Sequence, residues 1–403
     1  MGKMAKSKGT VISLGAGENQ VPFIKKAVEM GFQVIGVDIR SNAPGFSYCR
    51  NKIIESVTEY RRIYSQITKL SLDEQLVGVG CRSYGKAVLT SAYLSEKFKL
   101  PGNPLSILKS FYDKEKMKSY LFQNGINVPK QYNPSDILAE RKLKSITFPI
   151  IYKPVDGNSK KGIKILSSVD DLRKIPKSKS KVFLEDFIEG PEFTVLGLVS
   201  KSKFHLVSVS DKITTKFPPY LEIAHVLPSE YSNYLGEINL NMQRIINITG
   251  LMMGPVVAEF KANSKGELFL MEIMPEIGGE YLAEQLIPRY YKYDYFSDYV
   301  NIITGNNIKF NRKNRKSNLL SVMHFIVPPQ GKNIYKKTLY STEKSNIIPF
   351  FHKEMLSEGT VCETEGGNKE RVMVIGYDIK KDNLLEILPN KIGNMEVVFE
   401  KYN

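Results

Sequence analysis

Two glutamates in a predicted β-hairpin carry the clearest chemical signal of the sequence. Glu259 lies in the apolar segment 256–262 and Glu272 in the apolar segment 267–273, and the polar residues 263–266 between them are typical of a hairpin turn. Two carboxylates close together on a half-buried face repel each other unless a cation or a proton relieves them. Mg²⁺ binds such carboxylates together with phosphate oxygens. The pattern therefore predicts a magnesium site, with an exposed pair of glutamates as the alternative.

The expected register places both carboxylates on one face of this hairpin. Pairing Ala262 with Glu267 sets Glu259 opposite Leu270, and Glu272 is then one diagonal away on the same face. A register slip by two residues leaves both side chains on that face, because side chains alternate with a period of two. We therefore expect the two carboxylates to lie close together.

A lysine followed by a glycine-rich loop could bind a polyphosphate. Lys153 ends the apolar segment 148–152, and the loop after it contains Gly157, Ser159 and Gly162. A lysine on a rigid strand supplies a fixed positive charge, and the loop can direct backbone N–H groups at phosphate oxygens. The pattern differs from a Walker loop, because no Gly-Lys-Ser/Thr opens a helix. A solvated hairpin turn is the alternative interpretation.

Two further pieces of sequence could contact a nucleotide. The apolar strand 182–188 runs into a bend at 190–191, where backbone groups could hydrogen-bond a purine edge, and Glu192 beyond the bend could accept from ribose hydroxyls. Lys114 lies at the head of a predicted helix over 113–124 and could be a second phosphate contact. Taken alone, each piece is equally compatible with ordinary surface structure.

The elements around these residues predict an α/β protein. Strands at 10–14, 32–37 and 77–79 alternate with helices after Pro22 and at 87–98, which is typical of a parallel doubly wound unit. Within it, the turn Gly15-Ala16-Gly17 and Asp38 form half of a dinucleotide fingerprint, or only a tight turn. Farther along we expect short strands over 146–190, strands over 193–275 with a helix at 235–249, and helices over 276–304. In the tail we expect strands at 319–327, 371–377 and 395–399 and a helix at 381–388.

Composition excludes several classes of protein. The chain has 403 residues, 42% hydrophobic and 25% charged, and no apolar run approaches the ~20 residues of a membrane span. No secretory leader is evident, so we expect a cytoplasmic protein. The three cysteines and four histidines are scattered, which argues against a disulfide framework or a zinc site. The net charge of +15 is spread along the chain, which favours anionic small substrates over nucleic acid.

In their order along the chain, these motifs resemble an ATP-grasp enzyme from Val11 to about Tyr295. Segment 11–38 resembles the pre-ATP-grasp domain of relatives of carbamoyl-phosphate synthase and aminoimidazole-ribotide carboxylase. The resemblance implies a doubly wound domain over 1–112 and an ATP-grasp domain of two α+β subdomains over 113–305, with its lid at about 146–190. A small α+β extension over 306–403 would follow.

The resemblance also implies a role for each residue of the candidate site. The ATP phosphates would be bound by Lys114, Lys153, Gly157, Ser159 and Gly162, the adenine by the hinge Glu185, Asp186, Phe187 and Ile188, the ribose by Glu192, and Mg²⁺ by Glu259 and Glu272.

One departure from the family pattern concerns the second metal-binding strand. The family usually reads Glu-x-Asn-Pro-Arg there, whereas this chain has Met274 in place of the Asn and Glu276 in place of the Arg. Methionine is a poor ligand for Mg²⁺. Either Glu276 supplies an oxygen and Lys212 or Arg289 replaces the missing arginine as a catalytic cation, or the site is weakened.

Short strings favour one branch of the family. The segments 210–212, 218–220 and 278–280 resemble L-amino-acid ligases, which join a carboxylate to an amine through an acyl phosphate. We therefore expect an ATP- and Mg²⁺-dependent ligase acting on a small carboxylate and an amine, with no nucleic-acid or membrane partner. The tyrosine-rich segment 281–299 is a candidate homodimer surface. A biotin-independent carboxylase and a nucleotide-binding homologue without catalysis are the alternatives.

Overall fold

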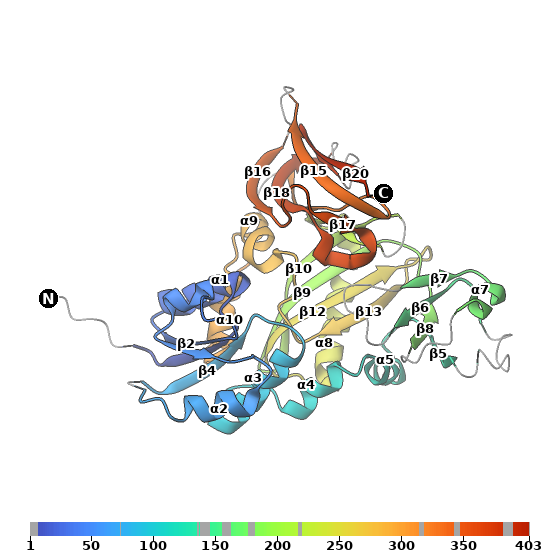
Figure 1. Ribbon diagram of the computed structural model, residues 1–403. Helices are drawn as coiled ribbons and strands as arrows, with labels where there is room; N and C mark the ends of the chain where they lie inside the picture. Colours follow the sequence, from blue (N-terminus) through green and yellow to red (C-terminus); the bar gives the residue numbers. More distant parts are fainter. Residues whose placement is uncertain are drawn as a thin grey trace.

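A computed structural model describes residues 7–72, 74–134, 137, 146–154, 163–175, 182–216, 220–313, 318–341, 347–381 and 390–402. In Figure 1 the N-terminal α/β unit, a small sheet, the central strands beside it and the C-terminal strands follow one another along the chain. The predicted phosphate-loop residues Gly157, Ser159 and Gly162 and nearly all of the predicted helix 381–388 lie outside the described residues.

The N-terminal unit is a parallel sheet flanked by helices, as predicted. Its strands are ordered β3-β2-β1-β4. They are β1 (Thr10–Leu14), β2 (Gln33–Asp38), β3 (Asn51–Ile54) and β4 (Leu76–Cys81), with η1 (Glu18–Gln20), α1 (Val21–Glu29), η2 (Pro44–Tyr48), α2 (Tyr60–Ile67), α3 (Lys86–Phe98) and α4 (Leu105–Phe111). Pro22 at the start of α1 suits its first turn, and the apolar β1 is buried along its whole length. The sequence analysis missed β3 and α2.

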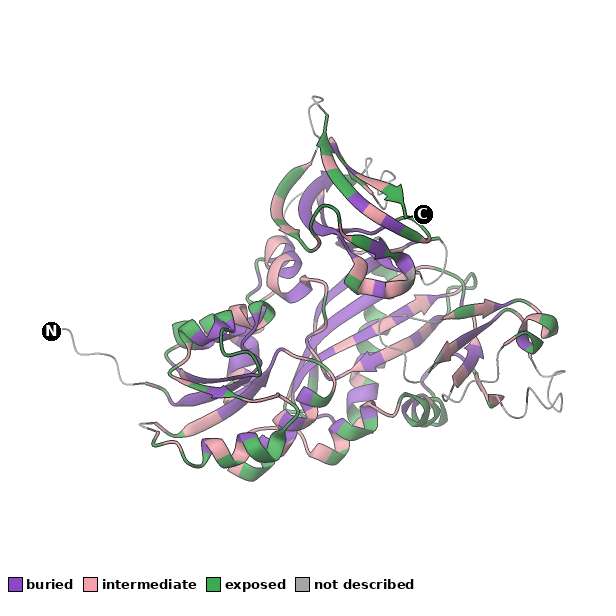
Figure 2. Ribbon diagram, in the orientation of Figure 1, coloured by how far each residue is buried: buried purple, intermediate pink, exposed green. Residues whose placement is uncertain are grey.

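A large antiparallel sheet forms the centre of the molecule (Figure 2). Its order is β13-β12-β9-β10-β11-β14-β18-β16. The strands are β9 (Glu192–Ser200), β10 (Lys203–Thr214), β11 (Glu222–Leu227), β12 (Gly254–Ala262), β13 (Leu268–Met274), β14 (Leu319–Ile326), β16 (Ile348–Glu354) and β18 (Met373–Lys380). The helical elements beside it are η4 (Ser232–Tyr234), α8 (Leu235–Thr249), η5 (Leu282–Leu286), α9 (Ile287–Tyr291) and α10 (Tyr295–Ile303). The predicted bounds of α8 are confirmed.

Two smaller sheets complete the described structure. The first, ordered β5-β8-β6-β7, occupies the expected lid and contains β5 (Gln131–Tyr132), β6 (Ile150–Pro154), β7 (Lys164–Leu166), α7 (Val169–Arg173) and β8 (Val182–Asp186). It follows α5 (Lys114–Gln123), whose N-cap Asp113 accepts a hydrogen bond from the N–H of Lys116. The second, ordered β17-β15-β20-β19, contains β15 (Lys332–Tyr340), β17 (Val361–Glu363), η6 (Thr364–Glu370), β19 (Lys391–Ile392) and β20 (Met395–Lys401).

The C-terminal section also supplies strands to the central sheet. β14 and β18 are buried almost from end to end, and they pair with each other and with β11 and β16. Strands that are apolar on both faces can occupy the interior of a sheet covered on both sides. The sheet therefore crosses position 305, while the domain boundaries at 112 and 305 stay a prediction.

The prediction that the tyrosine-rich segment forms a contact surface is wrong for its central residues. Tyr290, Tyr291, Tyr293, Tyr295 and Tyr299 are each at most 6% exposed and belong to an apolar cluster under the central sheet. A tyrosine can be buried when its hydroxyl finds a partner. The Tyr299 hydroxyl accepts a hydrogen bond from the Cys81 N–H at 2.8 Å, and the Tyr293 hydroxyl donates to Asp298 at 2.6 Å.

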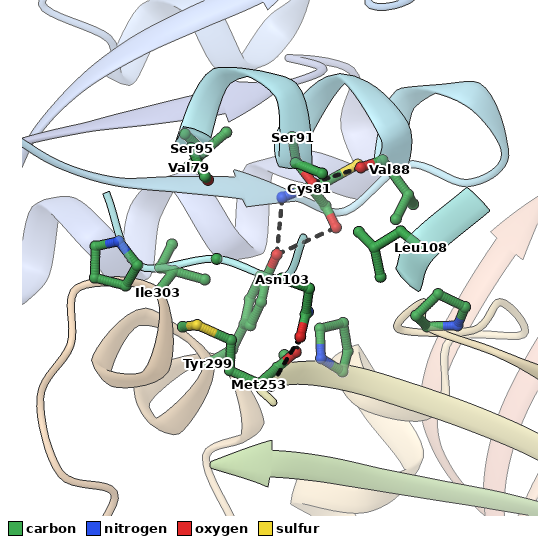
Figure 3. Close-up of a pocket in the computed structure, with 16 residues that line it drawn as sticks. Val79, Cys81, Val88, Ser91, Ser95, Asn103, Leu108, Met253, Tyr299 and Ile303 are labelled. Atoms are coloured by element: carbon green, nitrogen blue, oxygen red, sulfur yellow. Dashed lines mark hydrogen bonds between the residues drawn. The ribbon is translucent and has the colours of Figure 1, made fainter. Parts of the chain in front are cut away.

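A small cavity lies where the N-terminal unit packs against the start of β12 and the residues after β13 (Figure 3). Tyr299 and Asn103 point into the seam between the two parts, and Asn103 accepts hydrogen bonds from the N–H groups of Met252 and Met253. The cavity volume is about 50 Å³, which is enough for water but far too small for a nucleotide. It is a packing space between two parts of the fold.

Neither a membrane span nor a disulfide is found in the described residues. Among these residues, no helix combines the length and the apolar character needed to cross a bilayer. The three cysteines are free, and burial raises the pKa of Cys81 to about 12 and that of Cys49 to about 11. Both groups are therefore thiols at neutral pH.

Candidate active site

Glu259 and Glu272 face each other directly across β12 and β13. The predicted register is wrong in detail, because Ala262 pairs with Leu268 rather than Glu267. That register alone would turn Glu272 to the opposite face. A β-bulge between Glu259 and Phe260, which leaves Met271 as the extra residue on β13, restores the alternation and pairs Glu259 with Glu272. The two carboxylates thus share one face, as expected, through a bulge that the sequence pattern does not reveal.

A lysine contacts each of these carboxylates. Lys212 Nζ lies 2.7 Å from Glu259 Oε1, and Lys114 Nζ lies 2.8 Å from Glu272 Oε1. Burial alone would raise the pKa of Glu272, but the Lys114 ammonium outweighs it and holds that pKa below its usual range. Glu272 is therefore kept ionised, the state in which carboxylate oxygens bind a divalent cation.

The carboxylate pair suits an ion that takes its remaining ligands from elsewhere. Among the residues that the structure describes, no group of three or more Asp, Glu, His or Cys side chains could hold a metal by itself. Mg²⁺ is commonly bound by one or two carboxylates together with water and phosphate oxygens. Glu259 and Glu272 fit that donor set, with the side chains 31% and 40% exposed.

Lys212 is the centre of a buried ionic network. Its Nζ contacts Glu192 at 2.7 Å and Glu222 at 3.0 Å in addition to Glu259, and its side chain is 1% exposed. Burial would lower its pKa, but the surrounding carboxylates raise it well above the usual value. Lys212 is therefore a permanent cation beside the carboxylate pair, and its role as a catalytic cation stays a prediction.

The network continues into the C-terminal section through residues that the sequence analysis missed. Arg371 lies 2.8 Å from Glu222, and its guanidinium also contacts Glu280 and covers the ring of Phe325. Arg371 is 4% exposed. Its Nε is buried without a hydrogen-bond partner among the described atoms. A buried polar atom of this kind is a candidate contact for a ligand. The 278–280 string was noted for its resemblance, but no local signal links it to Arg371.

A second charged cluster lies in the lid. Lys153 of β6 and Lys118 of α5 both contact the buried carboxylate of Glu185. Burial would raise the pKa of Glu185, but the two ammonium groups hold it below its usual range. Lys118 was missed, although it follows Lys114 by one helical turn and therefore lies on the same face of α5. Because Lys153 and Lys118 share the carboxylate of Glu185, either lysine can leave it and bind a phosphate oxygen instead.

The rest of the expected hinge lies beside this cluster. Asp186 accepts from the Tyr132 hydroxyl, and the Lys261 ammonium lies 5.6 Å from the Phe187 ring centroid. Lys261 also donates to the Ile188 carbonyl at 3.2 Å. Glu192, the expected ribose ligand, lies 3.8 Å from Lys261 as well as on Lys212. The structure thus links the hinge to the carboxylate pair through adjacent strands.

Arg289 and Glu276 make contacts other than those expected of catalytic residues. Arg289 binds Asp378 of β18, five strands from Glu259 in the central sheet, and its described contacts are with Asp378 and Phe350. Glu276 turns towards the N-terminal unit, where its Oε1 accepts from the Tyr112 hydroxyl at 2.7 Å and from the Gly85 N–H at 2.8 Å. Both stay predictions as catalytic residues.

The glycine turn after β1 is occupied by the protein's own side chains. Asp38 accepts hydrogen bonds from the N–H groups of Ala16 and Arg40, each at 3.0 Å. A Cβ on Gly17 would lie 2.5 Å from the Arg40 guanidinium. These contacts favour a structural turn over a dinucleotide site.

Comparison with known proteins agrees with this arrangement. Residues 146–284 match the model of the ATP-grasp domain, so the resemblance inferred from the sequence is confirmed for this segment. The chain is 27% identical over 166 residues to a D-alanine–D-alanine ligase of Fusobacterium nucleatum, covering 40% of this chain and 55% of that protein. It is 23% identical over 187 residues to a formate-dependent phosphoribosylglycinamide formyltransferase of Methanocella arvoryzae, covering 44% and 42%. The chain thus spans about half the length of these curated relatives.

Solved structures extend the similarity of fold to nearly the whole chain. An L-amino acid ligase from Bacillus licheniformis superposes with a TM-score of 0.73 at 17% identity, covering 98% of this chain and 100% of that one. A phosphoribosylglycinamide synthetase from Anaerococcus prevotii gives a TM-score of 0.72 at 18% identity, covering 97% and 99%. The expected α/β fold with an ATP-grasp domain is therefore confirmed.

Proposed function

We propose that this chain is an ATP-dependent carboxylate–amine ligase that acts through an acyl phosphate. The observation that carries the proposal is the directly opposed pair Glu259–Glu272, with Lys114 and Lys212 on its two sides. Such a constellation supports a magnesium–nucleotide polyphosphate better than any other class of ligand, because it combines ionised oxygen ligands with cations for the remaining phosphate charge.

The proposed nucleotide lies between the central sheet and the lid. Lys153 and Lys118 would leave Glu185 to bind phosphate oxygens, and Lys114 would bind a further oxygen from the head of α5. The hinge backbone near Ile188 would contact the base, and Glu192 the ribose. Glu259 and Glu272 would hold Mg²⁺, which supplies charge neutralisation at the phosphates when bound.

The proposed substrates lie on the other side of the carboxylate pair. A substrate carboxylate would attack the γ-phosphorus and displace ADP, which gives an acyl phosphate. The neutral amine would then attack the acyl carbon, releasing inorganic phosphate and a proton to form the amide. Lys212 and Arg371 would stabilise negative charge that develops at the transferring group, because both are buried permanent cations. Their carboxylate partners hold them in place before reaction, so little reorganisation is required. Closure of the lid would exclude water, which otherwise hydrolyses an acyl phosphate.

An amino-acid substrate is the best-supported choice. D-Alanine–D-alanine ligases from three organisms match the sequence, and an L-amino acid ligase matches the fold over nearly the whole chain. Synthetases of phosphoribosylglycinamide and of carboxyaminoimidazole ribonucleotide share the fold too, but their names give ribose-phosphate compounds as products. We therefore place small amino acids first, as carboxylate donor, amine acceptor or both.

The test combines phosphate release with chemical trapping. The protein is incubated with ATP, Mg²⁺ and each standard L- and D-amino acid, with hydroxylamine present to convert an acyl phosphate into a coloured hydroxamate. Glu272→Gln should lower turnover by at least about a hundredfold. Glu267→Gln is the matched control, because Glu267 is an exposed residue in the turn of the same hairpin.

The outcomes separate the proposal from its alternatives. Hydroxamate formation that depends on one amino acid and is lost in Glu272→Gln supports the ligase. ATP binding without turnover in any mixture refutes it in favour of a nucleotide-binding homologue, which Met274 and Glu276 make the main alternative. Phosphate release that requires bicarbonate alone refutes it in favour of a carboxylase. Equal loss in Glu267→Gln and Glu272→Gln contradicts the metal assignment.

A further inference from the structure

Glu276 lies at the boundary between the carboxylate pair and the N-terminal unit. It follows β13 by two residues, and its side chain reaches Tyr112 and the first N–H of α3 at Gly85. Both contacts are made by the same oxygen, Oε1. Among the described residues, Oε2 has no hydrogen-bond partner, and the side chain is partly exposed. One carboxylate oxygen is thus anchored while the other is open to a ligand.

The charges around Glu276 leave it short of a cation. Burial is the largest effect on the pKa of Glu276 and raises it, and the nearby Glu272 carboxylate raises it further. The two hydrogen bonds of Glu276 and the charge of Lys114 lower its pKa, but by less. Lys114 is already 2.8 Å from Glu272. Lys212 is shared among three other carboxylates. Phosphate groups bound at the pair would draw on these lysines as well. A half-buried carboxylate in this position gains most from a positively charged ligand.

The location fits a second substrate better than the nucleotide. The strand order β3-β2-β1-β4 reverses direction between β1 and β4, and the loop after β4 leads to Gly85. Ligands of open α/β sheets bind in the crevice at the carboxyl ends of the strands where the order reverses. Glu276 contacts Gly85 at this edge of the sheet and interacts electrostatically with Lys114 and Glu272.

We propose that Glu276 is the specificity-determining residue that binds the ammonium form of the acceptor amine and excludes anionic acceptors. The inference rests on the proposed ligase function and names the charge of its second substrate. The anchored oxygen fixes the orientation of the carboxylate through Tyr112 and Gly85, and the open oxygen accepts from the ammonium group. The bound ammonium then loses one proton, to this carboxylate or to water, before its nitrogen attacks the acyl carbon. An acidic side chain here repels an acceptor of net negative charge more than a zwitterion or a cation.

The test compares a cationic acceptor with an uncharged one in the same reaction. The donor is the amino acid that gives most hydroxamate with the wild-type protein, and the acceptors are hydroxylamine, which is uncharged at neutral pH, and methylamine, which is an ammonium ion. Glu276→Gln keeps an oxygen for Tyr112 and Gly85 but removes the charge. Glu115→Gln, an exposed acid in the first turn of α5, is the matched control.

We expect Glu276→Gln to raise KM for methylamine by about tenfold or more, and to change KM for hydroxylamine and KM for ATP by much less. Glu115→Gln should change none of these values. An unchanged KM for methylamine in Glu276→Gln overturns the inference, and so does an equal loss with both acceptors. An increase confined to KM for the donor overturns it too. Absence of hydroxamate with the wild-type protein refutes the proposed function itself and the inference with it.

Discussion

Removal of the Lys212 ammonium group is the sharpest test of the buried network. In Lys212→Met a side chain of similar length remains, but Glu192, Glu222 and Glu259 lose a cation held at 2.7, 3.0 and 2.7 Å. Breaking a buried ion pair by deleting one partner typically costs 3–5 kcal/mol, because the remaining charge stays buried. Glu222 keeps Arg371 at 2.8 Å, and Glu259 is 31% exposed and can be hydrated. We therefore expect about 3 kcal/mol, at the lower end of that range.

The measurement is urea unfolding followed by far-ultraviolet circular dichroism, since the chain has no tryptophan. Lys203→Met is the control, because Lys203 is exposed at the start of the same strand β10, where such changes cost about 0.5 kcal/mol or less. Acidification should reduce the difference in unfolding free energy between Lys212→Met and wild type, because protonated carboxylates no longer require a cation. On the alkaline side, the titration of Lys212 itself matters. Its contribution to the unfolding free energy of the wild type is unaffected up to the ordinary lysine pKa and is lost only as the pH rises through the raised pKa of the folded state. Equal stability of Lys212→Met and Lys203→Met at neutral pH would refute the network.

Two further predictions concern His225 and Lys118. Burial, reinforced by the Lys212 charge, lowers the pKa of His225 from 6.5 to about 3. Below pH 6.5 the unfolded chain therefore binds a proton at His225 that the folded chain does not bind. Acidification from pH 6.5 to 5 should lower the free energy of unfolding by about 1.5 kcal/mol through this residue. His225→Gln should flatten that part of the pH profile, and an unaltered slope would contradict the assignment. Lys118→Met should weaken ATP binding by about tenfold or more in calorimetric titration, through loss of a largely buried charge contact, whereas the exposed Lys116→Met should not. Equal affinities would restrict Lys118 to a structural role.

Local patterns in the sequence were sufficient for the elements but not for their register. The helix over 235–249 is confirmed because its apolar spacing, and Gly250 directly after it, mark both ends. The hairpin turn over 263–266 is also confirmed, because Asn263 accepts from the N–H groups of Lys265 and Glu267. The bulge at Met271 has no such signature. It depends on how β12 packs between β9 and β13, which is a property of the whole sheet.

The carboxylates could be predicted from the sequence, whereas most of their partners could not. Glu259 and Glu272 stand out because charged residues interrupt apolar strands. Arg371 lies 99 positions beyond Glu272 in an unremarkable segment, and only the folding of β11 beside β14 and β18 brings it to Glu222. For the tyrosines of the 281–299 segment the sequence predicted a contact surface, whereas most of them are buried. Their amphipathic rings suggest a surface, but Tyr299 and Tyr293 satisfy their hydroxyls inside the fold.

The network gives the C-terminal section a direct part in the site. Glu259 is joined through Lys212 to Glu222, and Glu222 is joined to Arg371, so three sections of the chain contribute charges to one continuous cluster. Arg371 is held at its far side by Glu280, whose φ of 66° is unusual for a residue other than glycine. Such a backbone conformation persists only where the surroundings fix it. The placement of Arg371 therefore depends on the strand pairing of β14 with β18, and a chain that ends before β14 would leave Glu280 without Arg371 and Glu222 with Lys212 but not Arg371.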